Sequence, residues 1–165
     1  MIHAQSVLAF DRSLGALAAI LAKAEAHCAA GKIPPEALLQ FRLYPDMFPL
    51  TRQVQLACDF AARACARLAG EPPRSFPDTE TSFAELQDRI RTARAYIAGF
   101  DPARFQDAAE RVITFPAGGQ EMQMSGADFL SIFATPQLHF HLTTAYNILR
   151  HNGVVIGKRD YMGAA

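Results

Sequence analysis

Four stretches of the chain carry apolar residues at alternating spacings of three and four, and this pattern constrains the fold more than any other feature. Residues at such spacings lie on one side of an α-helix, so each stretch predicts a helix with one buried face. The first and second sets are Val7, Phe10, Leu14, Leu17, Leu21 and Val54, Cys58, Ala61, Cys65, Leu68. The third and fourth sets are Phe83, Leu86, Ile90, Ala93, Ile97 and Leu138, Leu142, Ala145, Leu149. Together they predict an all-α fold, a four-helix bundle.

Residues that start and stop helices separate these sets. Gly31 ends the first helix, and the segment 44–49 opens the second, with Asp46 as the expected cap. Ser82 and Glu85 form a capping box in front of the third helix, because the serine accepts from the backbone while the glutamate reaches back. The helix boundaries therefore follow from local chemistry as well as from periodicity.

A small β-hairpin is expected before the last helix. Residues 112–115 and 121–124 alternate in polarity around the glycine-containing turn 116–119. A lone hairpin is marginal in water, so it should lie against the helices. Pro136 predicts a kink or break near Thr135 in the helix that follows.

Composition limits the classes of partner. The 165 residues fit a single domain spanning 1–165, and 16 acidic residues balance 16 basic ones without blocks of either sign. This distribution predicts no nucleic-acid binding and no anionic membrane surface, and no uncharged apolar run approaches the roughly 20 residues that span a bilayer. A small-molecule ligand or a protein partner fits better.

The cysteines indicate the compartment. Cys28, Cys58 and Cys65 are an odd number and lie on apolar helical faces, where a free thiol behaves as a small buried hydrophobe. Three reduced thiols imply a reducing environment. The apolar stretch 14–22 has no basic leader before it, so it reads as a helix of the fold. We therefore expect a cytoplasmic protein.

Histidines on the last helix raise the question of a metal site. His139 and His141 project about 200° apart on a regular helix, and His141 and His151 are separated by about 15 Å along the axis. The usual helical zinc spacing needs a ligand at position 145, which is Ala145. We expect no metal and no other cofactor. If a divalent metal does bind, its expected ligands are His141 and Asp46.

His141 is instead expected to be a buried pocket histidine with a polar partner. Asp46 and Gln53 are the candidates for that partner if the second helix packs beside the fourth, although Asp46 could equally serve only as a cap. Tyr44 and Tyr146 could line a cavity nearby. The candidate ligand pocket therefore comprises Tyr44, Asp46, Gln53, His141 and Tyr146, and no catalytic residue can be assigned.

Three motifs resemble one bacterial family: residues 45–50, residues 133–136, and residues 141–157 followed by 158–160. The family is catalogued as domain of unknown function nineteen ninety-three, a branch of the DinB-like and YfiT-like four-helix proteins. The resemblance implies an up-down-down-up bundle that is commonly dimeric. It also implies relatives that hold a divalent metal through one histidine of the second helix and two of the fourth, some of them thiol-dependent transferases and isomerases.

This chain departs from that metal-binding pattern. Its second helix contains no histidine, and the fourth lacks the second histidine four residues after His141. Two functional hypotheses follow. The chain is a small-molecule-binding bundle with a degenerate metal site, or it is a divalent-metal-dependent hydrolase or thiol transferase with an incomplete histidine and aspartate site. In both cases we expect a homodimer, since closed two-fold pairs are the commonest oligomers.

Overall fold

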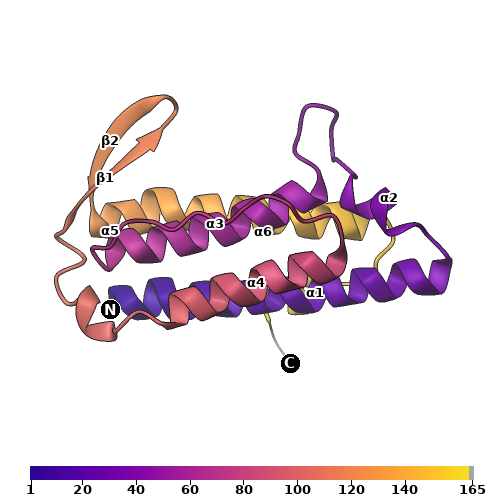
Figure 1. Ribbon diagram of the computed structural model, residues 1–165, viewed down its shortest axis with the longest axis horizontal. Helices are drawn as coiled ribbons and strands as arrows, with labels where there is room; N and C mark the ends of the chain where they lie inside the picture. The colour runs from indigo at the N-terminus through magenta and orange to yellow at the C-terminus, as the bar shows by residue number, and fades with distance from the viewer. Residues whose placement is uncertain (164–165) are drawn as a thin grey trace.

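The computed structural model describes residues 1–163, and its long helices lie side by side with a hairpin projecting at one end (Figure 1). These helices are α1 (Ala9–Gly31), α3 (Leu50–Leu68), α4 (Phe83–Ala98) and α6 (Thr135–His151). In Figure 1, α1 and α6 run in one direction, while α3 and α4 run in the other. Because α3 and α4 are parallel, the segment 69–82 returns along the length of the molecule to join them. The mainly helical fold is confirmed.

Short elements complete the described chain. They are the α-helices α2 (Pro35–Leu39), α5 (Gly126–Asp128) and α7 (Lys158–Tyr161), the 3₁₀-helix η2 (Pro102–Phe105), and the π-helices η1 (Ala4–Leu8) and η3 (Phe129–Ala134). A description as four helices therefore covers only the long elements. Within residues 1–163, no helix combines the length and the apolar character needed to cross a bilayer.

The capping box in front of α4 is confirmed. The Ser82 hydroxyl accepts from the backbone N–H of Glu85 at 3.2 Å, and the Glu85 carboxylate accepts from the backbone N–H of Ser82 at 3.1 Å. These bonds satisfy two of the backbone donors that the first turn of a helix leaves free. They also fix where segment 69–82 ends and α4 begins.

The expectation that Asp46 caps the second helix is wrong. α3 begins at Leu50 after Pro49, and Asp46 lies in an exposed turn before it. The residue before a proline is driven to extended conformations, so Phe48 could not continue a helix from Asp46 into Pro49. Pro49 itself is extended, with ψ of 166°.

The expected hairpin is present, formed by β1 (Val112–Ala117) and β2 (Gln120–Ser125) as an antiparallel pair. Gly118 and Gly119 form its two-residue turn with φ of 59° and 79°, values that favour glycine. Phe115 of β1 is buried, with its ring centroid 4.9 Å from that of Phe129. The hairpin is therefore anchored to the start of the last helical stretch.

Pro136 does not break that stretch. The π-helix η3 precedes α6 directly, and Pro136 lies in the first turn of α6. A π segment shifts the hydrogen-bond pattern by one residue, which accommodates a residue without an N–H inside a continuing helix.

Burial of the three cysteines agrees with the expectation of free thiols. Cys28, Cys58 and Cys65 are all buried and unbridged. Cys58 and Cys65 lie on α3 among small side chains, which allows α3 to approach both α4 and α6 closely.

Candidate functional site

The candidate site is built on a hydrogen bond between the second and the last long helices. Gln53 comes from the first turns of α3, and His141 comes from α6. His141 Nδ1 lies 2.8 Å from Gln53 Oε1, and the two residues are only 6% and 1% exposed. Gln53 Nε2 donates to the carbonyl of Phe48 at 3.1 Å. The amide oxygen must then face the imidazole, so His141 donates from a protonated Nδ1.

The other ring nitrogen of His141 is left as an acceptor. Nε2 has no hydrogen-bond partner within residues 1–163. In that part of the chain, Arg89 Nε is the one side-chain N or O atom that is both fully buried and unpartnered, so His141 Nε2 must be accessible to solvent. Phe60 stacks on the imidazole with centroids 5.4 Å apart, and Phe140 meets it edge-on at 5.2 Å. The site therefore offers one acceptor lone pair on an imidazole that contacts two aromatic rings.

Its environment keeps this imidazole neutral. Burial, and to a smaller extent the nearby positive charge of Arg52, lower the pKa of His141 to about 4. At neutral pH the ring is therefore uncharged and Nε2 can accept a hydrogen bond from a ligand O–H or N–H group.

This lowered pKa makes stability depend on pH. Between pH 6.5 and 4 the unfolded chain binds a proton at His141 and the folded chain does not, so acid favours unfolding. We expect His141 to account for a loss of about 2 kcal/mol in the free energy of unfolding between pH 7 and pH 5. Urea titrations of wild type and His141→Gln at both pH values measure this loss. An equal pH dependence in the two proteins would contradict the assignment.

The residues present do not fit the divalent metal that the family resemblance implies. Gln53 stands on the second long helix and Ala145 one turn after His141. His141 Nε2 is therefore the one imidazole nitrogen of the described chain that could ligate a metal here. Gln53 Oε1 is already engaged as an acceptor. Within residues 1–163, no three His, Cys, Asp or Glu side chains gather as a metal-holding group.

The remaining pocket candidates lie apart from this hydrogen bond. Tyr44 is 65% exposed, and Asp46 is exposed with no hydrogen bond joining it to His141. Tyr146 is half-buried and packs edge-on against Tyr161 of α7 at 5.9 Å. Of the candidate residues, the structure joins Gln53 and His141 directly.

The other histidine of the pair points elsewhere. His139 is exposed, and its Nδ1 lies 2.9 Å from the Tyr161 hydroxyl, which also lies 3.0 Å from Thr143 Oγ1. The expectation that His141 is nearer the interior than His139 is confirmed.

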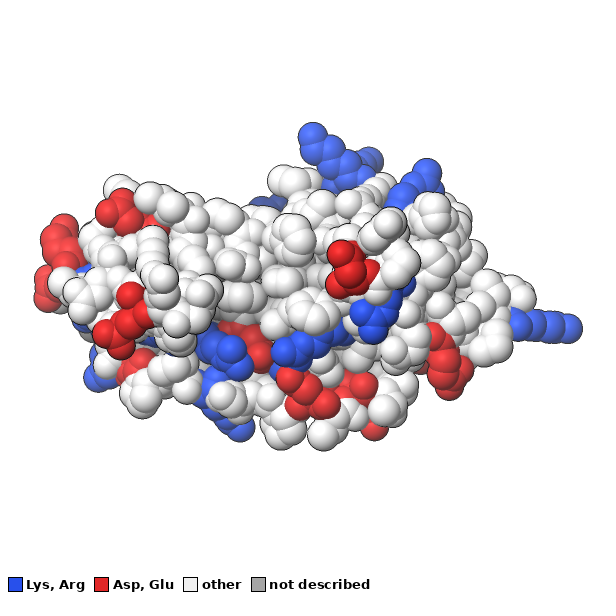
Figure 2. All heavy atoms as spheres, turned by 90° about the horizontal axis from the view of Figure 1, so that it is seen from above, with Lys and Arg blue, Asp and Glu red and all other residues white. Residues whose placement is uncertain are grey.

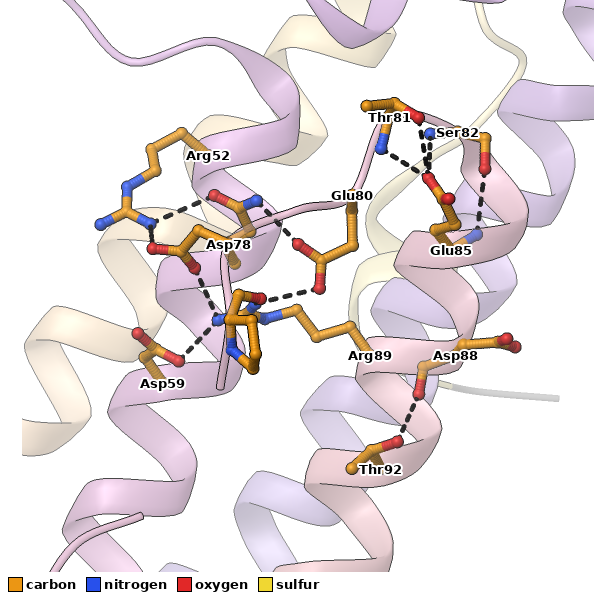
Figure 3. Close-up of polar contacts among 12 residues, drawn as sticks. Arg52, Asp59, Asp78, Glu80, Thr81, Ser82, Glu85, Asp88, Arg89 and Thr92 are labelled. Atoms are coloured by element: carbon orange, nitrogen blue, oxygen red, sulfur yellow. Dashed lines mark hydrogen bonds and ion pairs between the residues drawn. The ribbon is translucent and has the colours of Figure 1, made fainter. Parts of the chain in front are cut away.

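A buried ion cluster beside this site was not anticipated from the sequence (Figure 3). The side chain of Arg89 on α4 is 2% exposed and pairs with Asp59 of α3 at 2.7 Å. Arg89 also pairs with Asp78 and Glu80, each at 3.0 Å, and donates to the carbonyl of Pro77 at 2.7 Å. A single arginine thus holds segment 69–82 against α3 and α4.

The cluster extends toward His141 through side chains of α3. Arg52 pairs with Asp78 and donates to Gln55 Oε1 at 3.1 Å, and Gln55 donates to Glu80 at 2.8 Å. Burial raises the pKa of Asp59, although Arg63 and Arg89 oppose the shift. The sequence did contain a signal for this buried cluster. The charged residues Asp59 and Arg89 directly adjoin Cys58 and Ile90, which lie on the apolar faces of their helices.

The arrangement defines a helical protein of the DinB type. A crystal structure described as a DinB family member protein from Shewanella denitrificans is similar to this chain, with a TM-score of 0.93 and 43% sequence identity over 100% of this chain and 93% of that one. The model of the family described as domain of unknown function (DUF1993) matches residues 2–162, so the chain belongs to that family. No curated protein matches the chain.

Proposed function

We propose that this protein is a small-molecule-binding member of its family, a single-domain bundle whose histidine pocket operates without a metal. The observation that carries the proposal is the hydrogen bond from His141 Nδ1 to Gln53 Oε1. It places an amide opposite the imidazole on the second long helix, where the family resemblance implies a metal-ligating histidine. The site is then a degenerate metal site.

The chemistry around His141 supports binding over catalysis. A neutral imidazole with a pKa of about 4 is a weak base at neutral pH but a good hydrogen-bond acceptor. Phe60 and Phe140 flank it and offer aromatic surface to a ligand. We keep the proposal of a reducing, cytoplasmic location, which the three buried free thiols support.

Substitution of the histidines tests this role. His141→Ala strands the buried Gln53 amide oxygen, so we expect a loss of about 1–3 kcal/mol in the free energy of unfolding and a lower melting temperature. The matched variant His139→Ala should change it little, because His139 is exposed. Equal effects of the two variants on thermal unfolding would contradict the buried role of His141.

Metal addition tests the other half of the proposal. Zinc, nickel or manganese at 100 times its dissociation constant would stabilise the protein by about 2.7 kcal/mol. We expect no such shift for tag-free wild type. Stoichiometric metal in elemental analysis, lost in His141→Ala, would instead favour a metal-dependent hydrolase or thiol transferase.

The surface of η3 and α6 supports a homodimer, which we propose as the oligomeric state. Residues 129–149 contain no Asp, Glu, Lys or Arg, yet Ile132 is 64% exposed and Phe140 57% exposed. Figure 2 shows positive and negative side chains intermingled on the face seen from above, with a broad uncharged area beside them. An uncharged helix face with exposed apolar side chains is typical of a surface that another protein covers.

The dimer proposal predicts a change in mass. Light scattering should give twice the chain mass of 18.0 kDa for wild type, and Ile132→Asp should shift it toward the monomer. Val112→Asp is the control, because Val112 is 68% exposed on β1, outside this face. A monomeric wild type at micromolar concentration would end the proposal.

A further inference from the structure

A hollow lies between α3, the hairpin and the start of the last helical stretch. Its volume is about 290 Å³. Four phenylalanines line it: Phe60, Phe115, Phe129 and Phe133. The ring centroids of Phe115 and Phe133 are 4.5 Å apart, and those of Phe60 and Phe133 are 6.3 Å apart. The hollow therefore offers aromatic surface from three separate elements.

Two arginines on successive turns of α3 give the hollow positive charge. Arg63 pairs with Asp59 at 2.9 Å, whereas the Arg67 side chain has neither a hydrogen bond nor an ion pair within residues 1–163. Burial, and then the charge of Arg63, lower the pKa of Arg67. No acidic residue lines the hollow. Arg67 is a half-buried cation whose charge nothing in the described chain balances.

A larger groove in the same molecule contains an arginine whose charge is neutralised by a carboxylate. It lies between α1 and α4, with a volume of about 920 Å³. Its Arg94 donates to both carboxylate oxygens of Asp11, at 2.7 Å and 3.0 Å. Because Arg94 is paired with Asp11, its charge is not free to bind a ligand, whereas the charge of Arg67 is.

We propose that the hollow beside the hairpin binds a small aromatic carboxylate, with the ring against the phenylalanines and the carboxylate on Arg67. This hollow is not lined by His141, so the proposal adds a second ligand site and goes beyond the function proposed above. A guanidinium matches a carboxylate with two parallel hydrogen bonds, which a neutral ligand cannot accept as well. A volume of 290 Å³ is at the lower end for ligand pockets, which suits one aromatic ring with a short acidic arm.

Phe60 joins this hollow to His141. One of its contacts is the stacked imidazole of His141, and another is the edge of Phe133 inside the hollow. A ligand that moves the Phe60 ring changes the ring current at His141. The imidazole signals in an NMR spectrum therefore report occupancy of the hollow without any substitution at His141.

The experiment is a titration with phenylacetate, followed by NMR and calorimetry. We expect saturable binding, with shift changes at Phe115, Phe133 and the His141 imidazole. Phenylacetamide, which lacks the charge, and acetate, which lacks the ring, should each bind at least tenfold more weakly. This tenfold loss corresponds to about 1.4 kcal/mol.

Substitutions of Arg67 test whether its positive charge binds the carboxylate. Arg67→Met should weaken phenylacetate binding at least tenfold, Arg67→Lys should retain part of it, and the exposed control Arg150→Met should bind as wild type does. Circular dichroism confirms that each variant is folded. Absence of saturable binding to wild type, equal binding by Arg67→Met, or acetate binding as tight as phenylacetate would overturn the proposal.

The same samples separate this inference from the proposed function. Stoichiometric zinc at His141 with phenylacetate still bound through Arg67 would refute the metal-free pocket and leave the carboxylate site standing. A metal-free His141 without phenylacetate binding would refute the carboxylate site alone.

Discussion

Arg89→Met is expected to lower the free energy of unfolding by about 3 kcal/mol, since it removes the buried cation of the cluster and leaves the buried Asp59 with the more exposed Arg63 as its remaining ion-pair partner. Asp59 is 3% exposed and pairs with Arg89 at 2.7 Å, and segment 69–82 would lose three of the contacts that hold it. Burial already raises the pKa of Asp59, and removal of Arg89 raises it further. The deficit of the variant should therefore shrink at low pH, where Asp59 becomes protonated.

Urea unfolding of Arg89→Met at pH 7 and pH 5 measures both effects. The control is Arg91→Met on the same helix, where Arg91 is exposed and pairs with the exposed Asp88. That change should stay within about 0.5 kcal/mol of wild type. The double variant Arg89→Met with Asp59→Leu should recover part of the loss. If Arg89→Met were no worse than Arg91→Met, the cluster would not hold segment 69–82.

Gly126→Ala is expected to cost about 3 kcal/mol, at the upper end for overpacking. A Cβ built on Gly126 would lie 1.8 Å from the backbone carbonyl oxygen of Ala108, an atom that cannot rotate away. Ala127 N–H donates to the carbonyl of Ala109 at 3.0 Å, so the two segments are held together at this point. Relief of the clash would move the start of the last helical stretch and the hairpin before it.

Gly15→Ala provides the matched comparison with the opposite sign. Gly15 lies within α1, and an added Cβ would meet only the flexible side chain of Arg94, at 3.4 Å. Alanine in a helix interior is favoured over glycine by about 0.5–1 kcal/mol. Thermal unfolding should show a lower melting temperature for Gly126→Ala and an unchanged or higher one for Gly15→Ala. Two equal effects would contradict the close approach at Gly126.

Periodicity and capping were sufficient to predict the long helices and the hairpin. Local rules govern these features, because a stripe such as that of Phe83 and Ile97 and a cap such as Ser82 act within a few residues of each other. The glycine turn 118–119 likewise carries its own conformational signal.

Features that depend on contacts between distant segments were not predictable in the same way. Asp59 and Arg89 are thirty positions apart, and only the parallel packing of α3 and α4 brings them together. Asp46 illustrates a competition between local rules, since the restriction that Pro49 places on Phe48 outweighs the capping preference of aspartate.

The hydrogen bond between His141 and Gln53 could be predicted only in part. Helix geometry separated His139 from His141, and the chance that α3 packs beside α6 made Gln53 a candidate partner. The choice between Gln53 and Asp46 required the actual start of α3 at Leu50. The free charge of Arg67 had no sequence signal, because its neighbours in the hollow come from the hairpin and the last helical stretch.

The most direct test of the metal-free pocket is the ¹⁵N NMR spectrum of the His141 side chain at neutral pH, recorded before and after one equivalent of zinc. We expect a neutral ring with its proton on Nδ1, donated to Gln53, and no change in the Nε2 resonance on adding zinc. A proton on Nε2 in the free protein, or a stoichiometric zinc-induced shift of the Nε2 resonance, would contradict the account.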